Sequence, residues 1–230
     1  MTVMASSIDP RLAPDGIRFS LLGTMAALFE PPGSLDLATQ RRIWALAAQA
    51  DEWPEVAEAV PGVTNLMLIF SRPPIDPVAV AARLAEAWQV NDGVAIEGRH
   101  LDLPIVYGGE GGPHLDDVAL HTGLTVDEVV AIHTAPLYTV FAVGSHPGYC
   151  YLGGLDARLF VPRRDVPLLS IPKGSLSVAG MQTGVSASAG PSGWHTIGIA
   201  DVDFFDPFRV PPSLLRPGDT IRFQVQRVLR

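Results

Sequence analysis

Hydrophobic and polar positions follow two different periods in the first 98 residues. Short, mainly apolar runs at 17–22, 25–30, 55–60 and 64–70 predict strands, whereas segments 35–50 and 77–89 repeat apolar residues every three to four positions and predict helices. The expected buried faces are Leu37, Ile43, Trp44 and Ala47 on the first helix, and Val80, Leu84, Ala87 and Trp88 on the second. The order strand, strand, helix, strand, strand, helix predicts an α+β domain.

Two short helices are expected early in the second part of the chain. The first has Pro113 at its opening turn and Gly123 to end it. The second begins with Thr125 and Glu128 at the spacing of a capping box and ends before Pro136.

The rest of the second part has a β pattern of short apolar runs broken by Gly and Pro. The last predicted strand, 220–229, alternates apolar with polar side chains: Ile221, Phe223 and Val225 against Arg222, Gln224 and Gln226. We expect the strands of this part to close into a small barrel. We therefore predict an α+β domain at residues 1–98 and a β-barrel domain at 99–230.

Composition narrows the classes of function. The 230 residues carry a net charge of −8, and no Lys or Arg occurs between Arg99 and Arg158, so nucleic-acid binding is not expected. No run reaches the roughly 18 apolar residues of a membrane span, and residues 1–16 lack the pattern of a signal peptide. The single cysteine, Cys150, excludes an internal disulfide framework. We expect a cytoplasmic protein.

A glycine-rich turn, "YGGEGGPHL" at 107–115, comes directly before the first short helix of the second part. Backbone N–H groups at such a turn can converge on an anion, although glycines also serve tight turning alone. The sequence is not a phosphate-binding Walker loop, because the Gly-Lys-Ser/Thr ending is missing. The glycines of this turn are Gly108, Gly109, Gly111 and Gly112.

The six histidines show no zinc-binding spacing, so no metal is expected. His133 lies at the C-terminal end of a predicted helix, where the dipole favours the protonated ring, with a capping or core role as the alternative. The nucleophile elbow Gly-x-Ser-x-Gly is absent, which argues against a serine hydrolase.

Ordered motifs in the second part resemble a known family. They are "LPIVYGGEGGPHLDDVALHTGLTVDEVVAIHTAPLYTV", the stretch 144–184 with "GSHPGYCYLGG" and "IPKGS", "GPSGWHTIG" and "LRPGDTIRF". Together they resemble the family of the 5-oxoprolinase B subunit, which also contains the histidine-kinase inhibitor KipI and a protein once called allophanate hydrolase subunit 1. In the first part the resemblance rests on "LLGTMAALFE" and "VPGVTNLMLIFS".

This resemblance implies an N-terminal α+β sandwich followed by a cyclophilin-like β-barrel. It also implies a cyclophilin-fold partner like the C subunit, a further partner like the A subunit, and ATP-dependent opening of 5-oxoproline, with ATP bound in the assembled complex. Two alternatives stay open at this stage: an inhibitor that binds a sensor histidine kinase, and an assembly subunit with a degenerate site.

Candidate site residues follow from the matched motifs. His133, Lys173 and Gln182 are the expected catalytic residues. Arginines that the family pattern suggests are replaced here by Leu168 and Ser170 and by the stretch 199–201, and Lys173 is the nearest cation in sequence that could replace them. The expected substrate-binding residues are Gly108, Gly109, Gly111, Gly112, Tyr151, Gly153, Gly154, Ser175, Thr183 and Trp194.

Overall fold

The computed structural model describes residues 16–230. The expectation about a signal peptide concerns residues 1–16, of which all but Gly16 lie outside the described residues. The chain forms two compact units, one ending at Ala95 and the other beginning at Ile96. Each unit has its own hydrophobic core. They are described one at a time.

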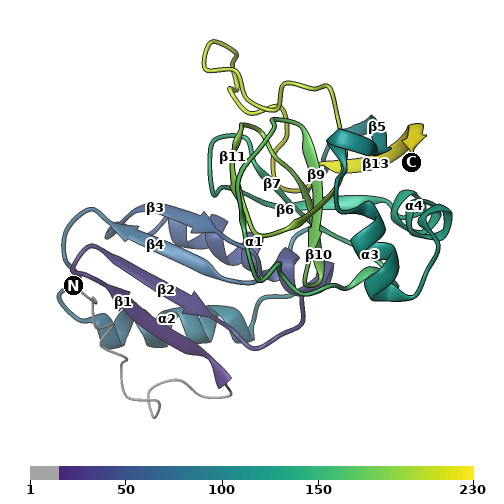
Figure 1. Ribbon diagram of the computed structural model, residues 1–230. Helices are drawn as coiled ribbons and strands as arrows, with labels where there is room; N and C mark the ends of the chain where they lie inside the picture. The colour runs from purple at the N-terminus through teal and green to yellow at the C-terminus, as the bar shows by residue number, and fades with distance from the viewer. Residues whose placement is uncertain (1–15) are drawn as a thin grey trace. The chain divides into compact units, whose positions relative to one another are not determined.

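The first unit is a four-stranded antiparallel sheet with two helices (Figure 1). In spatial order its strands are β1 (Arg18–Leu22), β2 (Ala26–Glu30), β4 (Leu66–Phe70) and β3 (Val56–Pro61). The helices α1 (Leu37–Asp51) and α2 (Pro77–Gln89) contribute to the same core cluster as the strands, so both cover one face of the sheet. Along the chain these elements follow the predicted order: strand, strand, helix, strand, strand, helix.

Local chemistry sets where these two helices begin. Asp36 caps α1 by accepting a hydrogen bond from the N–H of Thr39 at 2.8 Å. Asp76 caps α2, where Pro77 occupies the first turn and loses no hydrogen bond. The predicted buried faces are confirmed, except that Leu37 is only half-buried at the helix start.

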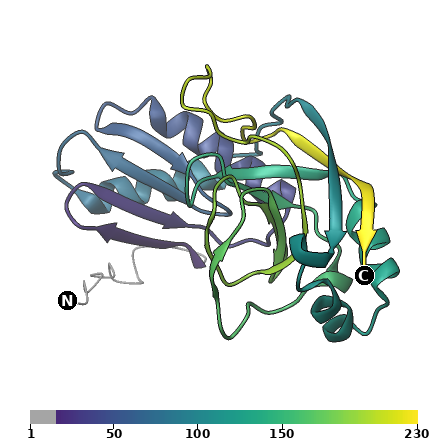
Figure 2. The same cartoon turned by 45° about the horizontal axis from the view of Figure 1, so that its top comes forward.

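The second unit is built on a closed barrel of seven strands, which confirms the α+β fold with a barrel (Figures 1 and 2). All neighbouring strands pair antiparallel except β13 and β5, which run parallel. Around the barrel the order is β10 (Gln182–Val185), β7 (Cys150–Gly153), β6 (Tyr138–Val143), β13 (Thr220–Leu229), β5 (His100–Gly108), β12 (His195–Ile199) and β9 (Ser175–Ala179). A separate two-stranded sheet joins β8 (Leu168–Ile171) to β11 (Gly190–Ser192).

Two helices and two short 3-10 turns complete the unit. The helix α3 (Leu115–Thr122) ends at Gly123, whose φ of 71° closes the helix in the left-handed conformation. The helix α4 (Val126–Thr134) starts with the predicted capping box, because Thr125 and Glu128 bond each other's backbone N–H groups. The 3-10 turns are η3 (Gly109–Gly111) and η4 (Ala157–Leu159).

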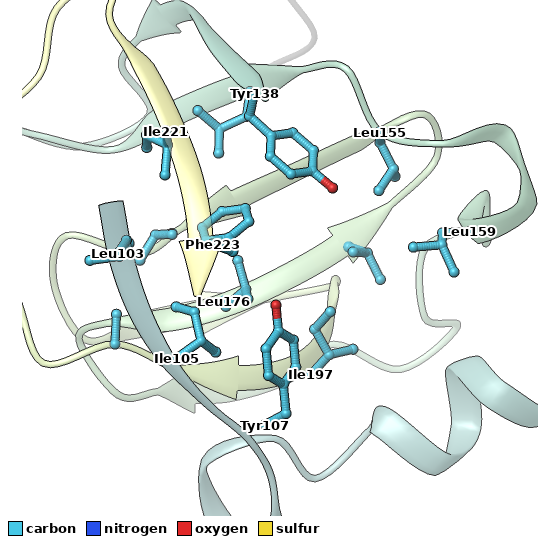
Figure 3. Packing of buried hydrophobic residues seen from close by; sticks show 14 of the residues in the cluster. Leu103, Ile105, Tyr107, Tyr138, Leu155, Leu159, Leu176, Ile197, Ile221 and Phe223 are labelled. Atoms are coloured by element: carbon cyan, nitrogen blue, oxygen red, sulfur yellow. The ribbon is translucent and has the colours of Figure 1, made fainter. Parts of the chain in front are cut away.

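Side chains from opposite walls fill the barrel interior, among them Ile105, Tyr107, Tyr138 and Phe223 (Figure 3). The alternation predicted for β13 holds only for its first half. Val225 is 48% exposed although it is still paired in register with Ile105, and the register against β5 shifts just after it, between Val225 and Arg227. An extra residue at such a bulge turns the following side chains out of the alternating pattern.

Among residues 16–230, the helices are all too short or too polar to cross a membrane.

Candidate functional site

A polar pocket of the barrel unit lies on the outer surface of its wall. Along β9, Leu176 and Val178 point into the core, so Ser175 and Ser177 face outward. The same alternation turns Tyr151 of β7 outward. The pocket has a volume of about 160 Å³ and is lined by Ser145, His146, Tyr149, Tyr151, Arg163, Ile171, Ser175, Ser177, Gly184, Ser186, Pro191, Ser192, Gly193 and Trp194. We call it the hydroxyl pocket.

Three aromatic rings form one wall of the hydroxyl pocket. Tyr149 and Tyr151 meet edge to face with ring centroids 4.8 Å apart, and Trp194 stands 6.3 Å from Tyr149 and 6.5 Å from Tyr151. Edge-to-face contacts of this kind are worth about 0.5–1.5 kcal/mol each beyond simple burial. The rings therefore support one another before any ligand binds.

Gly184 on β10 leaves room for the Tyr149 ring. A Cβ atom at this position would lie 2.7 Å from the Tyr149 hydroxyl oxygen and 3.0 Å from the carbonyl oxygen of Cys150. Both distances are shorter than side chains tolerate, so any larger residue would push Tyr149 away. The glycine is required by the position of the tyrosine.

Arg163 provides the positive charge of the hydroxyl pocket. Its guanidinium carbon lies 5.9 Å from the Trp194 ring centroid, within the range of a weak cation–π contact. Within the described part of the chain Arg163 forms no ion pair, so its donors are available to a carboxylate or phosphate. The pocket thus has a cation at its aromatic wall.

The phenol groups act as donors in this pocket. Burial raises the pKa of Tyr149, so its hydroxyl stays protonated at neutral pH. In contrast, Ser175 and Ser186 already donate their hydroxyl protons to nearby main-chain carbonyls at 2.7 and 2.8 Å. These serines offer lone pairs, whereas Tyr149 and Arg163 offer hydrogen atoms to a ligand.

His146 adds a neutral ring to the pocket. Desolvation lowers its pKa, and its buried Nε2 has no hydrogen-bond partner among residues 16–230. A buried polar atom of this kind costs free energy until something bonds to it. The structure therefore leaves one polar atom at the wall that a ligand or water can satisfy.

Of the residues expected in a substrate site, the structure brings together Tyr151, Ser175 and Trp194 in this lining. Gly153 and Gly154 lie close to Tyr151 in sequence but do not line the pocket. A Cβ on Gly153 would fall 2.0 Å from the Phe141 ring, and Gly154 has a φ of 108°, so packing and backbone geometry account for both glycines.

His133 and Thr183 lie inside the barrel core. Nδ1 of His133 is 2.9 Å from the Tyr107 hydroxyl, and Nε2 is 3.0 Å from Oγ1 of Thr183. The expectation of a protonated ring at the helix end is wrong, because complete burial lowers the pKa of His133 to about 3. The histidine lies in the core, and the catalytic role expected of it stays a prediction.

The glycine turn packs against the chain instead of opening as an anion cradle. A Cβ on Gly108 would lie 2.1 Å from the Leu229 carbonyl oxygen, and one on Gly112 would lie 2.3 Å from that of Ile197. Gly109 and Gly111 likewise face the side chains of Leu229 and Ile199. Close approach of neighbouring chain segments explains these glycines, and the N–H groups of Gly112, His114 and Leu115 already bond carbonyls of the chain. A substrate-binding role of the four glycines stays a prediction.

The two remaining catalytic candidates also lie outside the pocket lining. Lys173 is half-exposed and pairs with Asp203, while Gly174 after it has the predicted positive φ, 82°. Gln182 begins β10, and its buried Nε2 has no partner in the described part of the chain. Catalytic roles for Lys173 and Gln182 stay predictions.

Sequence reasoning missed Arg163, Tyr149 and His146. A signal was present: "VPRRDVP" carries two arginines between prolines, and "GSHPGY" falls within the motif that showed the family resemblance. Both stretches lie far along the chain from Trp194, so only the fold could show that they share a pocket.

As to metals, residues 16–230 bring no three His, Cys, Asp or Glu side chains together in a way that could hold an ion.

Comparison with known proteins agrees with this architecture. A family profile described as carboxyltransferase domain, subdomain C and D, matches residues 17–215. The urea amidolyase of K. lactis shares the fold with a TM-score of 0.78 at 17% identity, over 96% of this chain and 16% of that chain. The α+β unit and barrel thus form a domain of the carboxyltransferase class.

The sequence relatives identify the family within this class of domains. The 5-oxoprolinase B subunit of Escherichia coli O157:H7 is 41% identical over 210 residues, 91% of this chain and 96% of its own length. The chain belongs to the family of the 5-oxoprolinase B subunit, as the motifs predicted. The solved structure of TTHA0988 is also similar, at 32% identity and a TM-score of 0.69 over 89% of this chain, but this chain spans only 40% of it.

Proposed function

We propose that this chain is a cytoplasmic subunit of an ATP-dependent 5-oxoprolinase-type complex and that its hydroxyl pocket binds the cyclic amide substrate. The observation that carries the proposal is the guanidinium of Arg163, which has no ion pair among residues 16–230, beside the aromatic wall of Tyr149, Tyr151 and Trp194. The name of the relatives indicates the reaction, and the pocket supplies the chemistry that recognition of its substrate requires.

5-Oxoproline carries a carboxylate, a ring amide and a small apolar ring. Arg163 can bind the carboxylate through two parallel hydrogen bonds. The Tyr149 phenol, kept protonated by burial, can donate to the amide carbonyl. The face of Trp194 is a surface on which the ring can pack. Each part of the substrate thus has a complementary group in one pocket of about 160 Å³.

The chain is proposed to work with a cyclophilin-fold protein like the C subunit and with a third protein like the A subunit. ATP would bind in the assembled complex, as the similarity to the 5-oxoprolinase B subunit suggests. Donors aimed at the amide oxygen would favour the charge that develops there during ring opening, with the chemistry completed by the partners.

The test is reconstitution of the three proteins from the native host. We expect 5-oxoproline-dependent ATP hydrolysis only in the full complex, and loss of at least about tenfold in kcat/KM when Arg163 is replaced by Gln. Arg227→Gln is the matched control, since Arg227 is exposed and outside the pocket. Turnover by the isolated chain would contradict the proposal. Tight copurification with a sensor kinase, without activity in the complex, would favour the inhibitor alternative.

A further inference from the structure

A second pocket of the barrel unit shares Arg163 with the hydroxyl pocket. It has a volume of about 370 Å³ and is lined by His121, Pro162, Arg163, Arg164, Asp165, Val166 and His195. Two guanidinium groups and two imidazole rings therefore surround one space, in a chain whose net charge is −8. We call it the basic pocket.

Three separate parts of the unit bring these basic side chains together. His121 comes from the end of α3, the two arginines from the segment between η4 and β8, and His195 from the start of β12. The N–H of Arg164 donates to the Gly193 carbonyl at 2.8 Å, which ties the arginine segment to the loop before β12. The backbone thus holds the cluster in place.

His195 is fixed by its neighbours. Its Nε2 donates to the carbonyl oxygen of Pro162 at 3.1 Å, and its ring meets the His114 ring edge to face at 5.9 Å. Because a carbonyl only accepts, Nε2 carries the proton and Nδ1 of the neutral ring is an acceptor. This Nδ1 is buried and has no partner in the described part of the chain.

Donors in the basic pocket outnumber the carboxylates that could satisfy them. Arg164 pairs with Asp117 at 3.5 Å, yet its buried Nε finds no partner among residues 16–230. Arg163 forms no ion pair there, and Asp165 at the pocket edge is exposed. Each guanidinium has five N–H donors, so the pair with Asp117 leaves most of them available to water or to a ligand.

We propose that the basic pocket binds a phosphate group, either inorganic phosphate or the terminal phosphate of a phosphomonoester. A tetrahedral dianion presents oxygens on several sides and matches the donors of two neighbouring guanidinium groups, with His121 beside them; Nδ1 of His195 can accept a hydrogen bond from a protonated phosphate oxygen. A carboxylate has only two oxygens and could engage one arginine fully. The inference goes beyond the proposed function and does not depend on it, since it concerns an anion and a pocket that the cyclic amide does not require.

The shared arginine has a consequence for the two pockets. A guanidinium that binds phosphate in the basic pocket has fewer donors left for a carboxylate in the hydroxyl pocket. Arg164 and His121 line the basic pocket alone, whereas Tyr151 lines the hydroxyl pocket alone. Substitutions at these positions therefore separate the two sites.

The test is a titration of the full chain with inorganic phosphate at constant ionic strength. Binding is measured by calorimetry and by the chemical shifts of backbone amides in NMR. We expect saturable binding, weakened at least about tenfold by Arg164→Gln and clearly weakened by His121→Gln. Arg227→Gln and Tyr151→Phe should keep the affinity of the native chain. Thermal melting of each variant would verify that the fold is retained.

Two results would overturn the inference: no saturable phosphate binding by the native chain, or equal weakening by Arg164→Gln and Arg227→Gln, which would indicate attraction by net charge alone. Parallel titrations with AMP, a phosphomonoester, distinguish the source of the phosphate. Affinity above that of inorganic phosphate, lost in Arg164→Gln, supports a phosphomonoester; equal or lower affinity supports the free anion.

Discussion

The hydroxyl of Tyr107 lies 2.9 Å from Nδ1 of His133 in the centre of the barrel core. On the other side of the ring, Nε2 lies 3.0 Å from Oγ1 of Thr183, which donates its own proton to the carbonyl of Ser177. Thr183 must therefore accept from Nε2–H, and Nδ1 must accept from Tyr107. The neutral imidazole satisfies both bonds, and the charged ring would break one of them.

This network predicts that acid destabilises the protein through His133. The unfolded chain protonates this residue near its ordinary pKa of 6.5, whereas the folded pKa is about 3. The unfolded state thus binds more protons between these values, so the contribution is fully present above about pH 6.5 and is lost as pH falls toward 3. The loss should be about 1.4 kcal/mol per pH unit, or roughly 2 kcal/mol between pH 6.5 and 5.

Urea unfolding at several pH values would measure this effect. The His133→Gln variant should be less stable at neutral pH, because the core network is broken, but its stability should decrease less steeply with acid. His121→Gln is the control, since His121 is exposed. An unchanged pH slope in His133→Gln would contradict the prediction.

The Gly184→Ala substitution tests the geometry of the hydroxyl pocket. The added methyl would meet the Tyr149 hydroxyl at 2.7 Å, so we expect a loss of about 1–3 kcal/mol in unfolding free energy and a changed near-ultraviolet tyrosine signal. Gly144→Ala is a matched control, because nothing lies within 4 Å of the position of its Cβ. Equal stability of the two variants would show that Tyr149 is not held against this strand.

A comparison of Arg163→Gln with Lys173→Met tests which cation recognises the substrate. Arg163 lines the hydroxyl pocket, whereas Lys173 is exposed and pairs with Asp203. We expect Arg163→Gln to weaken binding of 5-oxoproline at least about tenfold, and Lys173→Met to change it less than about twofold. Both variants should stay within about 1 kcal/mol of the native stability. The reverse order, measured by calorimetry on the assembled complex, would restore Lys173 to the site.

Cys150 should be unreactive in the folded protein. It is buried in the barrel wall, and burial raises the pKa of its thiol to about 12, so almost no thiolate is present at pH 8. A disulfide exchange reagent should label it only after unfolding in urea, and the single cysteine makes the signal unambiguous. Rapid stoichiometric labelling of the native chain would contradict this prediction.

Much of the fold could be predicted from local patterns. Asp36, Asp76 and the pair Thr125 and Glu128 start helices through contacts within three residues, so their effect is visible in the sequence itself. The apolar periods of the first unit are equally local and predicted its elements in order. At Val225 the prediction was wrong, and the alternation does not resume after it, because β13 has a bulge against β5, a strand more than a hundred residues away in the sequence.

The site depended on contacts that no local pattern contains. His133 is polar and follows a helical pattern, and only the closed barrel buries it between Tyr107 and Thr183. Glycine spacing at 108–112 predicted a turn correctly, but whether the turn binds an anion depends on Leu229 and Ile197, which fill the space beside it.

By itself, the sequence determined the family, the α+β class and most of the helices and strands, because motifs, caps and periods act over a few residues. Only the tertiary structure decided which distant segments of the chain lie together. It placed His133 of α4 in the core and brought Arg163, Tyr149 and Trp194 to one pocket. The physical reason is that burial and hydrogen bonding between distant segments set the charge state and the partners of a side chain.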